Sequence, residues 1–132
     1  MALLEELGAY LDSEIVTLTA GTNLFYGRLP DDPDTAVALV EYGGEQPTSV
    51  MGSGTLPPVE SPRVQVICRA AGYSSARSLA ISVWAALEAV VNENLSGVRF
   101  HRVAALQSAF PLERDARDRV VFVQNFEVSK AT

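Results

Sequence analysis

Apolar residues recur at helical spacing in two parts of this chain. Residues 2–12 place leucines on one side of a helix, with two glutamates near the start, where negative charge complements the helix dipole. Residues 75–93 carry a broader apolar stripe at the same spacing. The pattern therefore predicts a short N-terminal helix and one long helix.

Other segments alternate or are continuously apolar, as strands are. In residues 62–70 one face carries Val64, Val66 and Cys68, and the other carries Arg63, Gln65 and Arg69. Such alternation is typical of a strand with one buried face. The predicted strands cover residues 22–29, 35–42, 62–70, 98–106 and 119–128.

Two segments without periodicity separate the predicted strands. Residues 30–34 combine two prolines with three aspartates and predict a turn. Residues 43–60 are rich in Gly, Pro, Ser and Thr, and a long loop of this kind is often a functional arm. We expect a long flexible loop there that binds a partner. The candidate binding residues are Gly43, Gly44, Gln46, Met51, Gly52, Gly54 and Leu56.

The order of these elements predicts an α+β fold. We expect a small, mostly antiparallel sheet of about five strands, with the long helix packed on one face and the short helix at the N-terminus. At 132 residues the chain fits a single domain over 1–132.

Composition then narrows the class of protein. The chain has 16 acidic and 10 basic residues, a net charge of −6, which argues against general nucleic-acid binding. No apolar run is long enough for a membrane span, and the acidic N-terminus does not resemble a signal peptide. The single cysteine, Cys68, allows no intramolecular disulfide and suits a reducing compartment.

Residues with catalytic chemistry are few and isolated. His101 is the only histidine, and Cys68 has no evident base to form a thiolate. Residues 52–54 (Gly-Ser-Gly) lack the Lys-Ser/Thr of a phosphate loop, and the aspartates of residues 31–34 lack the spacing of a calcium loop. We therefore expect no enzyme activity, no metal and no cofactor.

The charged run at residues 113–119 predicts a polar hairpin tip. Its charges alternate in sign, which in isolation is an ordinary solvated turn. In a symmetric ring the same charges can pair with a neighbouring subunit. The candidate inter-subunit residues are Arg114, Asp115, Arg117, Asp118 and Arg119.

Several segments, taken in order, resemble the small tail terminator proteins of long-tailed bacteriophages, also described as minor capsid or tail completion proteins. The segments that carry the resemblance are residues 26–42, residues 60–69, the helix with Tyr73, Ala76 and Leu79, residues 112–115, and residues 119–128 with Phe122-Val123-Gln124-Asn125-Phe126. They span nearly the whole chain but contain no catalytic signature.

The resemblance implies a structural virion protein without enzymatic activity. Such proteins form a hexameric ring on the head-proximal end of the tail tube, stop its polymerisation and present a surface to the head. The implied partners are copies of the chain itself, the tail tube protein and a head-completion or connector protein, with DNA only passing through the lumen. The implied location is the tail–neck junction of a virion made in the bacterial cytoplasm.

Two other classes stay open. Head-closure and head–tail connector subunits of the phage neck are similar in size to tail terminators. A small ligand-binding domain or hydrolase would need a pocket with converging polar groups.

Overall fold

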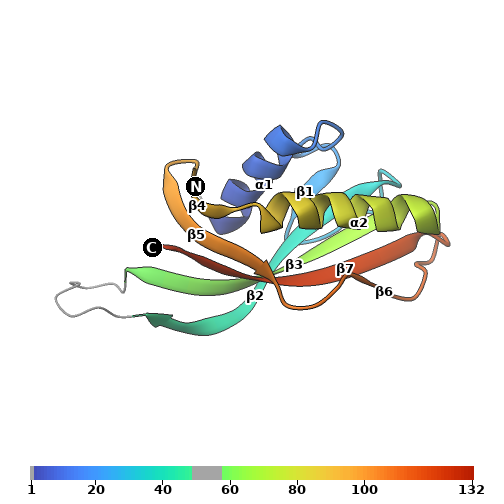
Figure 1. Ribbon diagram of the computed structural model, residues 1–132. Helices are drawn as coiled ribbons and strands as arrows, with labels where there is room; N and C mark the ends of the chain where they lie inside the picture. Colours follow the sequence, from blue (N-terminus) through green and yellow to red (C-terminus); the bar gives the residue numbers. More distant parts are fainter. Residues whose placement is uncertain (1, 49–57) are drawn as a thin grey trace.

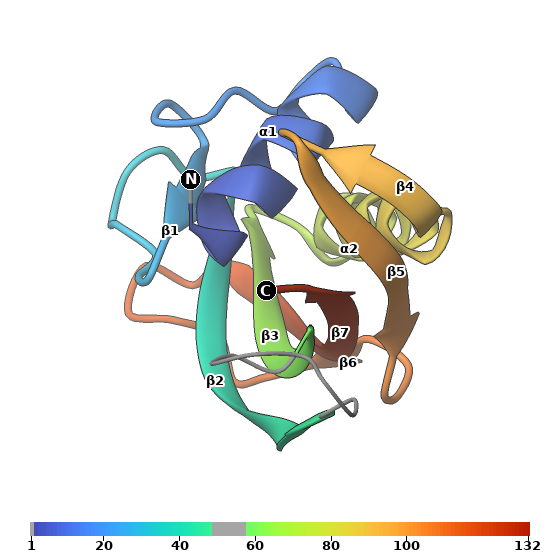
Figure 2. The same ribbon diagram turned by 90° about the vertical axis from the view of Figure 1, so that its left-hand side faces the viewer.

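A curled sheet with both helices on its concave side forms the molecule (Figures 1 and 2). The computed structural model describes residues 2–48 and 58–132. The helices are α1 (Leu3–Glu14) and α2 (Tyr73–Glu88). The strands are β1 (Leu24–Tyr26), β2 (Ala36–Thr48), β3 (Val59–Ala70), β4 (Val91–Leu95), β5 (Val98–Ala105), β6 (Phe110–Pro111) and β7 (Val120–Ala131).

The strand order within the sheet is β1-β2-β3-β7-β5-β4, and β6 pairs with β7 outside this path. β1 runs parallel to β2, and the remaining pairs are antiparallel. The sheet curls until α1 contacts β1 and β2 on one side and β4 on the other (Figure 2). The result is a half-barrel that α1 and α2 fill.

The helices are held by apolar side chains on one side of each. α1 buries Leu3, Leu7 and Leu11 at four-residue spacing. α2 buries Ala76, Ala80, Val83 and Leu87 against the sheet. Each large aliphatic side chain buried in this way contributes roughly 1.5–3 kcal/mol to stability.

β3 confirms the predicted alternation of faces. Val64, Val66 and Cys68 belong to the core shared with α1 and α2. Gln65 lies on the opposite face, where its Nε2 donates to Oδ1 of Asn125 at 3.2 Å. Burial also raises the pKa of the Cys68 thiol to about 12, so it stays protonated at neutral pH.

The predicted five-stranded, mostly antiparallel sheet with one long helix is wrong. Within the described residues, the sheet has seven strands and is mixed. The helix expected over 75–93 ends at Glu88, and β4 follows at once. Ser96 and Gly97, both with positive φ, join β4 to β5 in a two-residue turn that pairs Leu95 with Val98. Residues 91–93, predicted as the end of the helix, therefore belong to β4 at the edge of the sheet.

Strands extend into both ends of the segment predicted as a loop over 43–60. β2 continues to Thr48 and β3 begins at Val59, so both ends of this segment are paired strand. The pairing has register shifts between Tyr42 and Gly44 and between Glu45 and Thr48. Such irregularities are expected where glycine and proline are frequent. These residues also interrupt the alternation of apolar and polar residues that would have predicted a strand here. Residues 49–57 lie outside the described part of the chain.

Candidate functional site

The β2–β3 hairpin projects from one end of the molecule and is the predicted partner-binding arm (Figure 1). Gly43 and Gly44 bend β2 with φ of 44° and 151°. A Cβ atom on Gly44 would lie 2.7 Å from the carbonyl oxygen of Ser61, so this strand crossing requires glycine. Gln46 is exposed on the same strand.

Four of the predicted arm residues, Met51, Gly52, Gly54 and Leu56, lie outside the described residues. Partner binding by the arm therefore stays a prediction.

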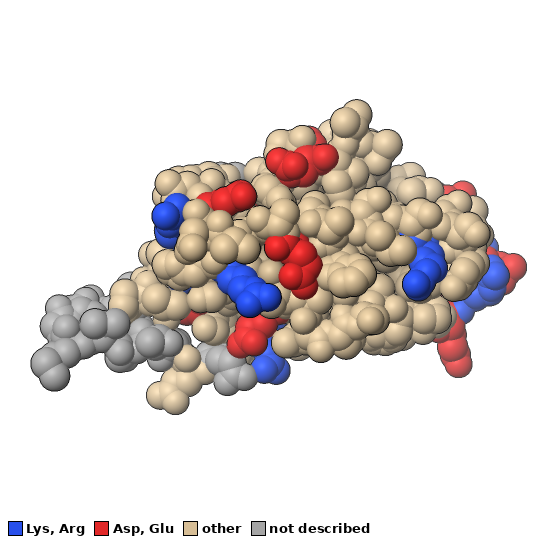
Figure 3. All heavy atoms as spheres, viewed as in Figure 1, with Lys and Arg blue, Asp and Glu red and all other residues tan. Residues whose placement is uncertain are grey.

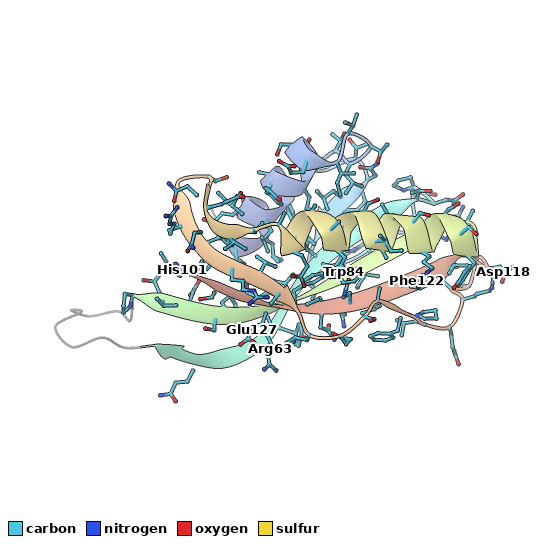
Figure 4. All side chains as sticks on the ribbon, viewed as in Figure 1. Arg63, Trp84, His101, Asp118, Phe122 and Glu127 are labelled. Carbon is cyan, nitrogen blue, oxygen red and sulfur yellow. The ribbon has the colours of Figure 1, made fainter. Side chains whose placement is uncertain are left out.

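The predicted hairpin tip, residues 113–119, lies at the opposite end of the molecule from the arm (Figure 4, Asp118). Asp115 organises it, because its Oδ1 accepts hydrogen bonds from the backbone N–H groups of Arg117 at 3.0 Å and Arg119 at 2.9 Å. The bond from the Arg119 backbone is the main reason that the pKa of Asp115 lies below its usual value.

Arg119 is the central side chain of this end, and its side chain is only 5% exposed. It donates to the Asp115 carboxylate at 2.8 Å, to Asp31 at 3.1 Å and to Asp34 at 3.2 Å. A guanidinium offers five N–H donors in a plane, which is why one arginine can bind three carboxylates. Arg119 thus ties the tip to the turn at residues 31–34.

Two further arginines bind the same turn. Arg69 of β3 donates to the backbone carbonyls of Pro33 at 2.5 Å and Asp34 at 3.1 Å. Arg117 lies 3.1 Å from a carboxylate oxygen of Asp32. We call Arg69, Arg117 and Arg119, with the turn they hold, the arginine clamp.

The five predicted tip residues therefore have different surroundings. Arg117 and Arg119 bind carboxylates of their own chain. Arg114 and Asp118 pair with each other at 3.8 Å at the surface, and their side chains are 52% and 85% exposed. Pairing of the tip with a neighbouring subunit stays a prediction, and Arg114 and Asp118 are the tip residues most accessible to one.

A buried ion cluster was missed at the sequence level. Nζ of Lys130 on β7 lies 3.1 Å from Oε1 of Glu6 on α1 and 3.3 Å from Oε1 of Glu60 on β3. Nζ also lies 5.5 Å from the ring centre of Phe100. The sequence assigns Glu6 only a favourable position near the start of the helix, and no local pattern links it to a lysine 124 positions later.

The residues weighed for chemistry stay apart from one another. His101 is a half-buried residue of β5 (Figure 4), and Cys68 lies in the core. Within the described residues, no group of three or more His, Cys, Asp or Glu side chains could hold a metal ion. Neither described helix is long and apolar enough to cross a membrane.

The fold of this chain resembles that of a protein of known structure. It is similar to a chain in the solved structure "Virion of native gene transfer agent (GTA) particle", with a TM-score of 0.61. The two sequences are 23% identical, and the similarity covers 99% of this chain and 96% of that chain. At this identity the likeness establishes the shared fold.

The sequence identifies the family. Residues 4–132 match the family model for the bacteriophage tail terminator protein, and the chain belongs to that family. It is therefore a structural protein of a phage-type virion, as the resemblance predicted. No curated protein matches the sequence.

Proposed function

We propose that this chain caps the head-proximal end of a tail tube as a ring, stops tube polymerisation and provides the surface that joins the tail to the head. The observation that carries the proposal is the family match over residues 4–132, which leaves almost no part of the chain outside the tail terminator pattern. The proposed partners are other copies of the chain, the tail tube protein and a head-completion or connector protein.

The shape of the subunit supports this function. The β2–β3 arm lies at one end of the molecule and the tip that carries Asp118 at the other (Figures 1 and 4). Subunits arranged side by side in a ring would present one kind of end on each face. A ring that binds a tube on one face and a connector on the other needs two such different faces.

The charge of the chain suits a channel for DNA. A net charge of −6 per subunit makes a six-membered ring strongly acidic. An acidic lumen repels phosphates, so DNA would pass without adhering. The arm is the candidate contact to the tail tube.

Electron microscopy of tails made with and without the protein tests the proposal. Without it we expect tubes of uncontrolled length that do not join heads. Purified protein added to such tubes should bind one end as a ring with a central hole. Protein bound to isolated heads and absent from isolated tails would instead identify a head-closure or connector subunit and contradict the proposal.

A further inference from the structure

One side of α2 exposes large apolar side chains. Tyr73, Ile81 and Trp84 are 54%, 43% and 38% exposed. At 3.6 residues per turn they lie within a quarter of the helix circumference, and Arg77 lies between them.

The segment after β5 also exposes large apolar side chains, but Phe110 pairs with Val123, whose side chain lies on the face of the sheet away from α2. Leu106, Phe110 and Leu112 are 44%, 38% and 52% exposed. The segment runs along β7, where Pro111 pairs with Phe122, and the Tyr73 ring lies 5.7 Å from the Phe122 ring.

A shared carboxylate fixes the other end of this surface. Oε1 of Glu88 accepts from Nε1 of Trp84 at 3.3 Å and from the backbone N–H of Ala105 at 2.9 Å. We call the surface formed by Tyr73, Ile81 and Trp84 the apolar flank. In Figure 3, charged side chains are sparse over the middle of α2 and the segment below it. Large apolar side chains exposed together on one side of a helix are typical of an interaction site.

A groove whose α2 side carries only small side chains lies on the neighbouring side of α2. Its volume is about 550 Å³, and its α2 wall consists of small side chains that include Ser82, Ala85 and Ala89. The other wall includes Glu14 and Val16 at the end of α1, and Val16 is 94% exposed. We call this the α1–α2 groove.

The floor of the groove is fixed by a contact between the helices. The hydroxyl of Tyr10 donates to the carbonyl of Ala86 at 2.6 Å. Burial, and then the charges of Glu14 and Glu93, raise the pKa of Tyr10, so the hydroxyl keeps its proton. This hydrogen bond holds α1 and α2, which form the walls of the groove, next to each other.

We propose that the apolar flank of one copy packs into the α1–α2 groove of a second copy, with Arg77 against Glu14. The surfaces match in size, because large aromatic side chains meet serine and alanine. They also match in charge, since Arg77 and Glu14 are exposed and form no hydrogen bond or ion pair within the described residues. In a head-to-tail ring, each subunit would cover its apolar flank with one neighbour and its groove with the other.

The placement of the two surfaces suits a closed ring. They lie about 130° apart around the axis of α2, which has 3.6 residues per turn. Because the two surfaces are not on opposite sides of the subunit, each head-to-tail contact rotates the next subunit relative to the last. Repeated rotation of this kind can bring the last subunit back to the first and form a ring. This inference rests on the proposed function for the ring itself, and it adds the surfaces that join the subunits.

A charge-swap experiment tests the contact. Arg77→Glu and Glu14→Arg alone should each weaken ring formation roughly tenfold or more, because like charges would face each other. A mixture of the two variants should restore rings in which they alternate, hence rings with an even number of subunits. The double variant R77E/E14R should form rings alone. Arg28→Glu, an exposed arginine outside both surfaces, is the matched control and should assemble normally.

Native mass spectrometry and electron microscopy read out assembly, alone and on tail tube ends, with circular dichroism as the check on folding. If wild-type protein forms rings and both single variants form them equally well, the contact is wrong while the proposed function stands. If single variants fail and neither the mixture nor the double variant recovers, the contact is also wrong. If wild-type protein forms no ring alone or on tube ends, both proposals fail.

Fluorescence gives a second test that needs no substitution. Trp84 is the only tryptophan of the chain and is 38% exposed in the single subunit. Ring formation through the apolar flank should shift its emission to shorter wavelength and protect it from iodide quenching. Assembly without any change in emission or quenching would overturn the proposed contact.

Discussion

Nζ of Lys130 lies 3.1 Å from Oε1 of Glu6, and both side chains are almost completely buried. The pair joins the last strand, β7, to the first helix, α1. Lys130 is also the only lysine of the sequence. A buried charge is tolerated only with its partner, because transfer from water to the protein interior costs several kcal/mol for each ion.

Lys130→Met should therefore destabilise the fold by about 3–5 kcal/mol, since Glu6 would be left buried without its cation partner. Urea denaturation followed by circular dichroism measures the change. The double variant E6Q/K130M removes both charges and should recover most of the lost free energy of unfolding. Equal stability of Lys130→Met and wild-type protein would show that the pair does not hold α1 on the sheet.

The arginine clamp should matter far more than the exposed pair of the same tip. Arg119→Ala removes a guanidinium that binds Asp31, Asp34 and Asp115, and we expect a loss of about 2–3 kcal/mol. Hydrogen exchange should rise in residues 31–34. The matched control is Arg114→Ala, whose exposed pairing with Asp118 should contribute under about 1 kcal/mol. The idea fails if the two variants are equally stable.

Asp115 should make the stability of the arginine clamp depend on pH. Hydrogen bonds from the Arg119 backbone lower its pKa in the folded state below the unfolded value of about 3.9. The stabilisation is therefore complete above about pH 4 and is lost as pH falls through the lower folded pKa. Urea unfolding between pH 2 and pH 6 should show a shallower loss of stability in Asp115→Asn than in wild type. Identical slopes would rule out this contribution.

Among the described glycines of the arm, Gly44 should be the one that least tolerates a side chain. Gly44→Ala places a Cβ against the backbone of Ser61 at a φ of 151°, and we expect a cost of about 1–3 kcal/mol. Hydrogen exchange should increase across β2 and the start of β3. Gly43→Asn is the matched control, because a Cβ there meets nothing and asparagine accepts a φ of 44°. A Gly44→Ala protein with unchanged exchange would contradict the close crossing.

Deleting residues 46–58 should separate folding from function. The core strands pair mainly outside this segment, so we expect a normal circular dichroism spectrum and cooperative unfolding. Tail completion, measured as the fraction of tubes joined to heads, should be lost if the arm binds the tube. Unchanged completion would make the segment only a spacer between β2 and β3.

Local patterns were sufficient for much of the fold. The alternation over residues 62–70 predicts both the strand and its buried face, because successive side chains of a strand point in opposite directions. The spacing of leucines predicts α1 for the corresponding reason. Residues 90 and 91 misled the prediction, because two valines continue the helical stripe, and only their position beside β5 assigns them to the sheet edge.

The sequence alone therefore determined the segments with a regular apolar period and the resemblance to tail terminators. Only the tertiary structure decided that the sheet is mixed and curled, that the tip arginines bind the turn at residues 31–34, and that Lys130 meets Glu6. The physical reason is distance along the chain. Periodicity reports which side of an element is buried, whereas an ion pair between residues 85 or more positions apart depends on how the whole sheet bends.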